Sequence, residues 1–119
     1  MPYPFSENES IAIRDLALRN DFVFSIVWHS SRSGNLSEKV FSSWKWEDTK
    51  ESPDLNIIKP IADQFASNIN TEDGTSPYLS VYSGSRNGKL HDWFYQQSVC
   101  IQYLVEAGTA NLKPDSILI

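Results

Sequence analysis

Two apolar segments, each preceded by a helical pattern, constrain the fold of this chain more than any other feature. The first, Asp21 to His29, reads Asp-Phe-Val-Phe-Ser-Ile-Val-Trp-His, and the second, Ser98 to Glu106, reads Ser-Val-Cys-Ile-Gln-Tyr-Leu-Val-Glu. Apolar runs of this length are typical of central strands in a sheet that is covered on both faces. Their alternation with helices predicts an α/β domain with a mainly parallel sheet.

The first helix is expected from Glu7 to Arg19. It begins at Ser6-Glu7-Asn8-Glu9, which has the pattern of a capping box. Ile13, Leu16 and Ala17 follow at helical spacing, so we expect them to form a buried stripe.

Weaker patterns predict the remaining elements. Apolar residues from Ile58 to Ile69 keep helical spacing, but Pro60 interrupts it, which favours a kink or a helix that starts near Lys59. A short helix is expected over Lys89–Gln97, and short strands over Glu38–Ser43 and Tyr78–Ser83. The sheet should then have about three to four strands, with Phe22–Trp28 and Val99–Val105 at its centre.

Composition narrows the class of partner. The chain has 119 residues, one domain's worth, and carries 10 Lys+Arg against 15 Asp+Glu, a net charge of −5. The basic residues are scattered, so we expect no nucleic-acid partner. No apolar run approaches the ~18 residues of a membrane span, so we expect no membrane partner. The first residues do not resemble a signal peptide, and the localisation stays unknown.

The only cysteine, Cys100, lies within the second apolar segment. A single cysteine excludes a disulfide within the chain and a cysteine-rich zinc site. Its apolar neighbours predict a buried, unreactive thiol.

Polar groups at strand ends are the first candidates for function, because functional groups of parallel α/β sheets gather at the carboxyl ends of strands. His29 ends the first apolar segment and could ligate a metal or transfer a proton; the alternative is a partly buried histidine bonded to backbone. Glu106 ends the second and is a candidate general base. The alternative for Glu106 is a carboxylate that turns to solvent or pairs with a cation such as Arg86.

Two further candidates lie outside these strands. Tyr82 precedes a loop rich in glycine and serine, which suits a lid that hydrogen-bonds a substrate; the alternative is an ordinary surface tyrosine. His91 and Asp92 are neighbours in the short helix, and we expect this pair on the solvated side of that helix.

Taken in chain order, four motifs resemble the zinc carboxypeptidases, the M14 metallopeptidases. The motifs are the helix entry Pro4-Phe5-Ser6-Glu7-Asn8-Glu9, the strand end His29-Ser30, the tyrosine loop from Tyr82 into Asp92-Trp93-Phe94-Tyr95, and the strand end Tyr103-Leu104-Val105-Glu106. The resemblance covers roughly Pro4 to Gly108 and implies a three-layer αβα fold.

The resemblance implies a role for each candidate. His29 matches the third zinc ligand, and Glu106 matches the general base that activates the zinc-bound water and protonates the leaving amine. Tyr82 matches the lid tyrosine, and His91 would face the pocket for the C-terminal side chain. The implied cofactor is zinc, and the implied substrates are the C-termini of peptides and proteins, whose terminal peptide bond is hydrolysed.

The resemblance also implies that the site is incomplete. The family's first two zinc ligands belong to a His-x-x-Glu motif upstream of the third, and no histidine precedes His29 here. The family's substrate-binding arginines also lie upstream. Residues 1–119 would then be a single partial domain, the C-terminal half of a catalytic domain, and inactive in isolation. The alternative is a non-catalytic α/β binding or pseudo-enzyme module.

A partial sheet leaves an uncovered edge, and uncovered edges tend to pair. We therefore expect self-association through a sheet edge or through the apolar tail Ile117-Leu118-Ile119.

Members of the family that the chain resembles are often secreted or periplasmic.

Overall fold

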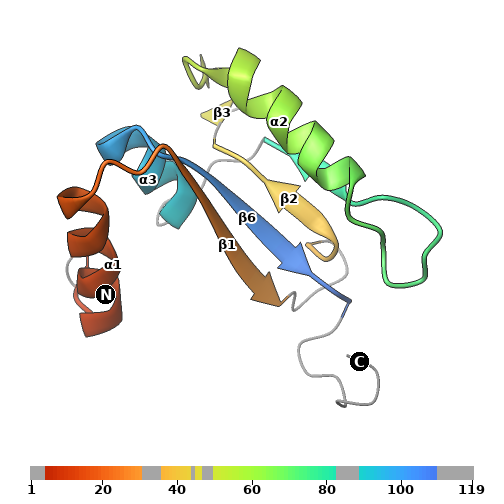
Figure 1. The fold of residues 1–119 in the computed structure, drawn as a ribbon, viewed down its shortest axis with the longest axis horizontal. Helices are drawn as coiled ribbons and strands as arrows, with labels where there is room; N and C mark the ends of the chain where they lie inside the picture. The colour runs from red at the N-terminus through yellow and green to blue at the C-terminus, as the bar shows by residue number, and fades with distance from the viewer. Residues whose placement is uncertain (1–4, 31–35, 44, 47–49, 83–88, 110–119) are drawn as a thin grey trace.

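The computed structural model describes residues 5–30, 36–43, 45–46, 50–82 and 89–109 (Figure 1). In chain order its elements are α1 (Asn8–Arg19), β1 (Phe24–Ser30), β2 (Lys39–Phe41), β3 (Lys45–Trp46), β4 (Lys50–Glu51), α2 (Leu55–Ser67), β5 (Leu79–Val81), α3 (Leu90–Ser98) and β6 (Ile101–Ala107). The expected α/β class is confirmed. Among the described residues, no helix is both long enough and apolar enough to cross a membrane.

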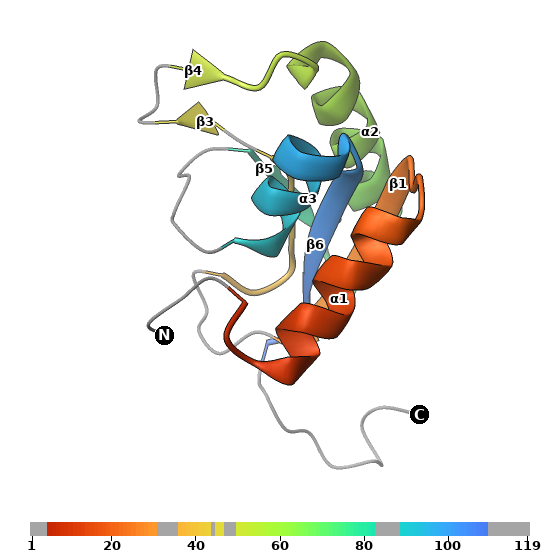
Figure 2. The same ribbon diagram turned by 90° about the vertical axis from the view of Figure 1, so that its left-hand side faces the viewer.

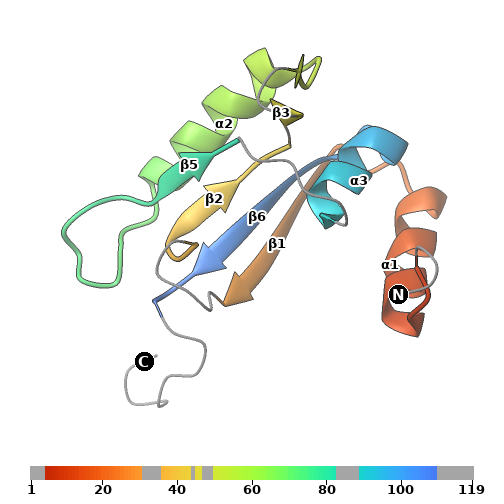
Figure 3. The same cartoon turned by 180° about the vertical axis from the view of Figure 1, so that it is seen from behind.

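Four of the strands form one mixed sheet in the order β1-β6-β2-β5. β1 and β6 are parallel, as are β2 and β5, whereas β2 runs antiparallel to β6. Figure 3 shows β6 between β1 and β2. The carboxyl ends of β1 and β6 therefore lie at one end of the sheet, and those of β2 and β5 point toward the other.

β1 lies at an edge of the sheet, so the expectation that it is a central, covered strand is wrong. Val23 is 75% exposed, Phe24 42% and Trp28 61%. α2 packs mainly over β2 and β5, and from β1 the Trp28 ring lies 6.4 Å from that of Phe65. An apolar run indicates a strand, but which strands flank it is decided by long-range pairing that the run itself does not encode.

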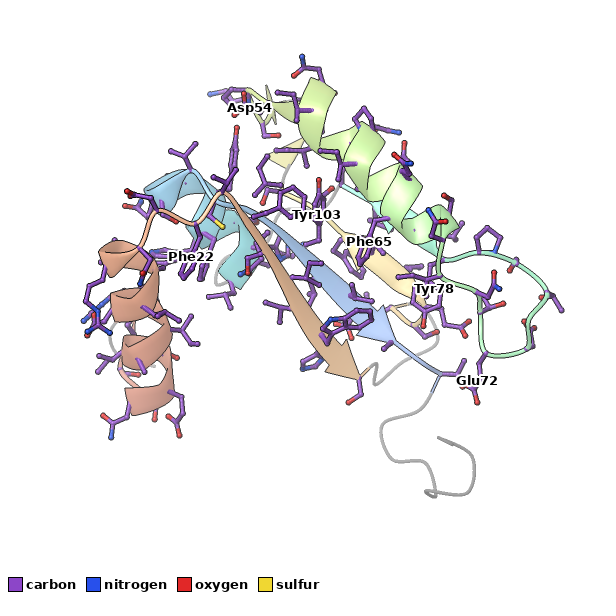
Figure 4. The ribbon with its side chains drawn as sticks, in the orientation of Figure 1. Phe22, Asp54, Phe65, Glu72, Tyr78 and Tyr103 are labelled. Atoms are coloured by element: carbon purple, nitrogen blue, oxygen red, sulfur yellow. The ribbon has the colours of Figure 1, made fainter. Side chains whose placement is uncertain are left out.

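The larger core lies between α2 and the sheet. Ile58 and Ala62 of α2 are fully buried in one cluster with Tyr103 and Val105 of β6, and the Tyr103 hydroxyl donates to the Ile58 carbonyl at 2.8 Å. Figure 4 shows Tyr103 and Phe65 in the space between α2 and the sheet. Because side chains alternate along a strand, the odd-numbered residues of β6 face α2.

α3 and α1 form the layer on the other side of β6 (Figure 2). Ala17 of α1 packs with Phe94 of α3 and with Cys100, so the expected burial of Cys100 is confirmed. Ile13 and Leu16 are 41% and 45% exposed and Ala17 is 2% exposed, so the predicted burial of the stripe is confirmed for Ala17 and wrong for Ile13 and Leu16. The reason is that, among the described elements, α1 packs mainly against α3.

Two helices begin at other residues than expected, and two short strands were not expected at all. α1 starts after Glu7, which makes no capping bond through its side chain; Ser6 Oγ donates to Glu7 Oε1 at 2.9 Å, so the capping box does not form. α2 begins at Leu55 and runs through Pro60 without ending. β3 and β4 pair antiparallel within a segment that has no strand pattern.

α3 ends in a left-handed turn that leads into β6. Val99 has a φ of 54°, and its amide donates to the Tyr95 carbonyl at 3.1 Å while the Cys100 amide donates to the Phe94 carbonyl at 3.3 Å. The bond from the Val99 amide to the Tyr95 carbonyl is the one that defines an αL C-cap. The turn aims β6 back along the sheet and so sets where Glu106 lies.

Candidate active site

The structure brings His29 and Glu106 together. They are register partners at the carboxyl ends of the adjacent parallel strands β1 and β6. His29 Nδ1 lies 3.1 Å from Glu106 Oε2. The Glu106 side chain is only 12% exposed, whereas that of His29 is 57% exposed. The alternative of a carboxylate that turns to solvent does not describe this geometry. Arg86, the cation named in the other alternative, lies outside the described residues.

The contact determines which nitrogen of His29 is free. When Glu106 is ionised it can only accept hydrogen bonds, so Nδ1 must carry the proton that is shared with Oε2. The lone pair of a neutral imidazole then lies on Nε2. An exposed imidazole held in this way can bind a metal or accept a proton through Nε2.

Lys39 is the residue that sequence reasoning missed at this site. It is the register partner of Glu106 on the antiparallel strand β2, and directly opposed residues point to the same face of a sheet. Glu106 therefore lies between a histidine on one neighbouring strand and a lysine on the other. The pattern of the Glu38–Ser43 segment indicates a strand but carries no information on its direction or register.

The structure does not bring Tyr82 beside this pair. Tyr82 follows the carboxyl end of β5, and β5 is parallel to β2 and so antiparallel to β6. It therefore lies toward the end of the sheet away from Glu106. Its half-buried ring faces the Lys59 Nζ atom, 5.5 Å from the ring centre. The glycine- and serine-rich loop that follows lies outside the described residues.

His91 is 3% exposed, so the expectation that it lies on the solvated side of α3 is wrong. Ser43 Oγ donates to the His91 carbonyl at 2.9 Å. Ser43 lies beyond the carboxyl end of β2, which puts His91 toward the amino end of β6, away from Glu106.

His91 and Asp92 form a buried polar pair. His91 Nε2 lies 3.6 Å from Asp92 Oδ1, too far for a hydrogen bond. Burial, with a further contribution from the charge of Lys89, lowers the pKa of His91 to about 4. Burial raises the pKa of Asp92 to about 6.

The described residues do not by themselves fit a zinc ion. A catalytic zinc takes about three protein ligands and keeps one position open. Over 5–30, 36–43, 45–46, 50–82 and 89–109, no group of three or more His, Cys, Asp or Glu side chains could hold a metal. His29 is one candidate ligand, and its Nδ1 atom contacts Oε2 of Glu106.

Taken together, the mixed sheet and the paired strand ends define an α/β domain with a histidine–carboxylate site at one end of the sheet. Comparison with known families then identifies the chain: it belongs to the zinc carboxypeptidase family of M14 peptidases, whose family model matches residues 1–118. No curated protein and no solved structure matches. The family match confirms the resemblance seen in the motifs, and at the level of the family it supports a zinc-dependent peptidase of the hydrolase class.

Proposed function

We propose that this chain supplies His29 and Glu106 to the active site of a metallocarboxypeptidase that hydrolyses C-terminal peptide bonds. The observation that carries the proposal is the 3.1 Å contact between His29 Nδ1 and Glu106 Oε2 at the ends of adjacent parallel strands. Membership of the zinc carboxypeptidase family supports the same reaction class.

Each residue has a distinct part in this proposal. His29 offers its imidazole to the metal, and Glu106 takes a proton from the attacking water and delivers it to the leaving amine. A zinc ion, if His29 and ligands from an upstream segment held it, would supply an acidified water and polarise the scissile carbonyl. We also propose that Tyr82 contacts the substrate, as its place in the family's motifs implies, and moves toward the site when the substrate binds. The motifs imply a substrate contact for His91 as well, but the proposal does not extend to it, because its side chain is 3% exposed.

The proposal implies that the 119-residue chain alone is inactive, because His29 is its single matching ligand. After dialysis, elemental analysis should find far less than one zinc per chain. Blocked dipeptides with a free C-terminal carboxylate should show no release of the terminal amino acid above background. Stoichiometric zinc together with cleavage would contradict our account of the missing ligands.

The ligand role of His29 can be tested on the same chain by NMR. During a zinc titration, the imidazole signals of His29 should shift in the millimolar range, whereas those of the buried His91 should stay constant and serve as an internal control. His29→Ala should abolish the response. A zinc titration that moves neither imidazole would overturn the ligand role.

The role of Glu106 needs a polypeptide in which an upstream segment carries the His-x-x-Glu motif. There, Glu106→Gln should lower kcat by about 10²–10⁴-fold, the usual worth of a general base, with the zinc content unchanged. His29→Ala should lower the zinc content as well. Unchanged turnover in Glu106→Gln would overturn the general-base role of Glu106, and absence of turnover in the unaltered polypeptide would favour the non-catalytic binding module.

A further inference from the structure

Lys39 is a charged residue beside the candidate site that the proposed function does not use. It opposes Glu106 across the β2–β6 pair, and Figure 3 shows β2 directly beside β6. Directly opposed residues have Cβ atoms about 5 Å apart and point to one face of the sheet. Glu106 therefore has a lysine on one neighbouring strand and His29, with Nδ1 at 3.1 Å from Oε2, on the other.

The same face of the sheet carries an aromatic ring and a second lysine. Phe41 lies two residues beyond Lys39 on β2 and opposes Leu104 of β6, so it points to the same side as Lys39. Lys89 directly precedes α3, and its Nζ atom lies 5.9 Å from the centre of the Phe41 ring. Lys39, Phe41 and Lys89 are all partly exposed. Two positive charges thus border a half-buried apolar ring on the face that Glu106 occupies.

The spacing of these residues matches the reach of a substrate's terminal side chain. In the proposed reaction Glu106 acts at the last peptide bond, so the terminal side chain begins within one residue of it, about 3.5 Å. Lys39 lies one strand away from Glu106, about 5 Å, and Phe41 lies about 7 Å along β2 from Lys39. A side chain with one or two methylene groups and a carboxylate can therefore contact the ring and the lysines together.

We propose that Lys39 and Lys89 bind the carboxylate of an acidic side chain at the C-terminus of the substrate, with its methylene groups on Phe41. This inference rests on the proposed function and names its class of substrate, peptides that end in glutamate or aspartate. Lysine ammonium groups bind carboxylates through charge-assisted hydrogen bonds, which are stronger than those to a neutral amide.

Two carboxylates of the chain lie near the lysines and limit the strength of this binding. The Glu106 side chain contacts His29 and is 12% exposed, and that of Asp92 is 19% exposed. Burial raises the pKa of Asp92 to about 6, and the charge of Lys89 acts against this rise. Because both carboxylates are largely buried and both lysines are partly exposed, a ligand in solvent meets the positive charges first. Repulsion by the carboxylates keeps the expected preference modest.

A binding test on the 119-residue chain needs neither zinc nor catalysis. Acetyl-leucyl-glutamate and acetyl-leucyl-glutamine have nearly the same shape and differ by one charge. In NMR titrations the glutamate peptide should bind about fivefold more tightly, as expected for two weak, partly exposed ion pairs. The methyl signals of Leu104, on the face of the lysines, should shift, whereas those of the exposed Ile57 on α2 should stay constant.

Lysine variants test whether these two charges cause the preference. Lys39→Met and Lys89→Met each remove one charge and keep an unbranched side chain. Each should lower the preference for the glutamate peptide about twofold, and the double variant should abolish it. Lys50→Met is the matched control, because Lys50 is exposed on β4, outside the four-stranded sheet. It should leave the preference unchanged, and the NMR spectrum of each variant verifies that it folds.

The outcomes separate this inference from the proposed function. Equal binding of the two peptides, or a preference that survives in the double variant, would overturn the acidic subsite and leave the proposed function standing. Zinc titrations that move neither imidazole would overturn the proposed function, whereas a preference that depends on both lysines would still support a carboxylate-binding site at this face.

The same preference should appear in turnover by a polypeptide that also carries the upstream His-x-x-Glu motif. There, kcat/KM for a peptide ending in glutamate should exceed that for one ending in glutamine about fivefold, and the ratio should fall to about one in the double lysine variant. An active polypeptide that cleaves the two peptides equally well would overturn the acidic subsite.

Discussion

Burial shifts the pKa values of two neighbouring side chains at the start of α3 in opposite directions. It lowers the pKa of His91 to about 4 and raises the pKa of Asp92 to about 6, so it favours the neutral form of each. Above about pH 6 a carboxylate charge enters a site where Asp92 Oδ1 has no hydrogen-bond partner among the described residues. The pair therefore links the stability of the fold to pH.

As the pH falls, His91 and Asp92 change the stability of the fold in opposite directions. Unfolded His91 binds a proton below about pH 6.5, whereas folded His91 does so only near pH 4, so this residue removes stability as the pH falls from 6.5 to 4. Folded Asp92 binds a proton below about pH 6 and unfolded Asp92 only below about 3.8, so it adds stability over much of the same range. In the unaltered chain the two effects offset each other.

Asp92→Asn should expose the contribution of His91. Relative to the unaltered chain, its free energy of unfolding should fall by about 3 kcal/mol between pH 7 and pH 4, since one pKa unit corresponds to about 1.4 kcal/mol. Urea unfolding at pH 4, 5, 6 and 7 measures this difference. His91→Gln should show the reverse trend, and two variants that run parallel to the unaltered chain would contradict the assignment.

Individual site residues differ in how well the sequence predicts them. His29 and Glu106 could be found because each closes an apolar run, and parallel pairing then places strand ends together. The burial of His91 could not be predicted, because its neighbours include Ser43, which is 48 residues away in the sequence. The position of Lys39 beside Glu106 depends on an antiparallel register that local sequence does not specify.

Among the helices, α2 contains a residue that ordinarily breaks a helix. Pro60 is exposed in the second turn, where it cannot donate a hydrogen bond to the Asn56 carbonyl. The helix persists because Ile58, Ala62 and Ala66 are all buried against the sheet. Tertiary packing thus outweighs the local preference that suggested a later start near Lys59.

Pro60→Ala should stabilise the fold. It restores the hydrogen bond to Asn56, and alanine is favoured over proline inside a helix by about 3 kcal/mol, less about 1 kcal/mol for the greater freedom of the unfolded chain. We expect a higher Tm in thermal unfolding. Pro53→Ala, an exposed proline before the helix, is the control and should leave Tm unchanged or slightly lower. A lower Tm in Pro60→Ala would show that the proline ring is needed where it is.

The sequence predicts the type of most elements better than their arrangement. The segments that became β2, β5 and α3 have boundaries within a few residues of their patterns, because turns and apolar spacing are local signals. The edge position of β1 and the exposure of Ile13 on α1 were mispredicted, because both depend on which elements pack against them. The same run of apolar residues serves equally well for a covered and an uncovered strand.

Across the whole molecule, protection from solvent falls from β6 outward. β6 is hydrogen-bonded on both sides, contacts α3 and carries the fully buried Tyr103 and Val105. α1 packs mainly against α3 and buries only Ala17. Elements with few buried contacts open locally at a lower free energy.

Hydrogen exchange should follow this gradient. The amides of β6 should exchange most slowly, those of α2 next, and those of α1 fastest among the helices. NMR exchange rates of the unaltered chain at neutral pH measure the order. Protection of α1 equal to that of β6 would mean that the molecule opens only as a whole.

The central position of β6 also sets an order of events in time. β1 and β2 are neighbours along the chain, but β6 lies between them in the sheet, and His29 meets Glu106 across 77 residues of sequence. Contacts of such long range require the closing of a large loop and slow the folding of a domain. On a ribosome, the two halves of the site stay apart until residue 106 has left the exit tunnel, so a nascent chain stalled before that point holds the histidine without its carboxylate.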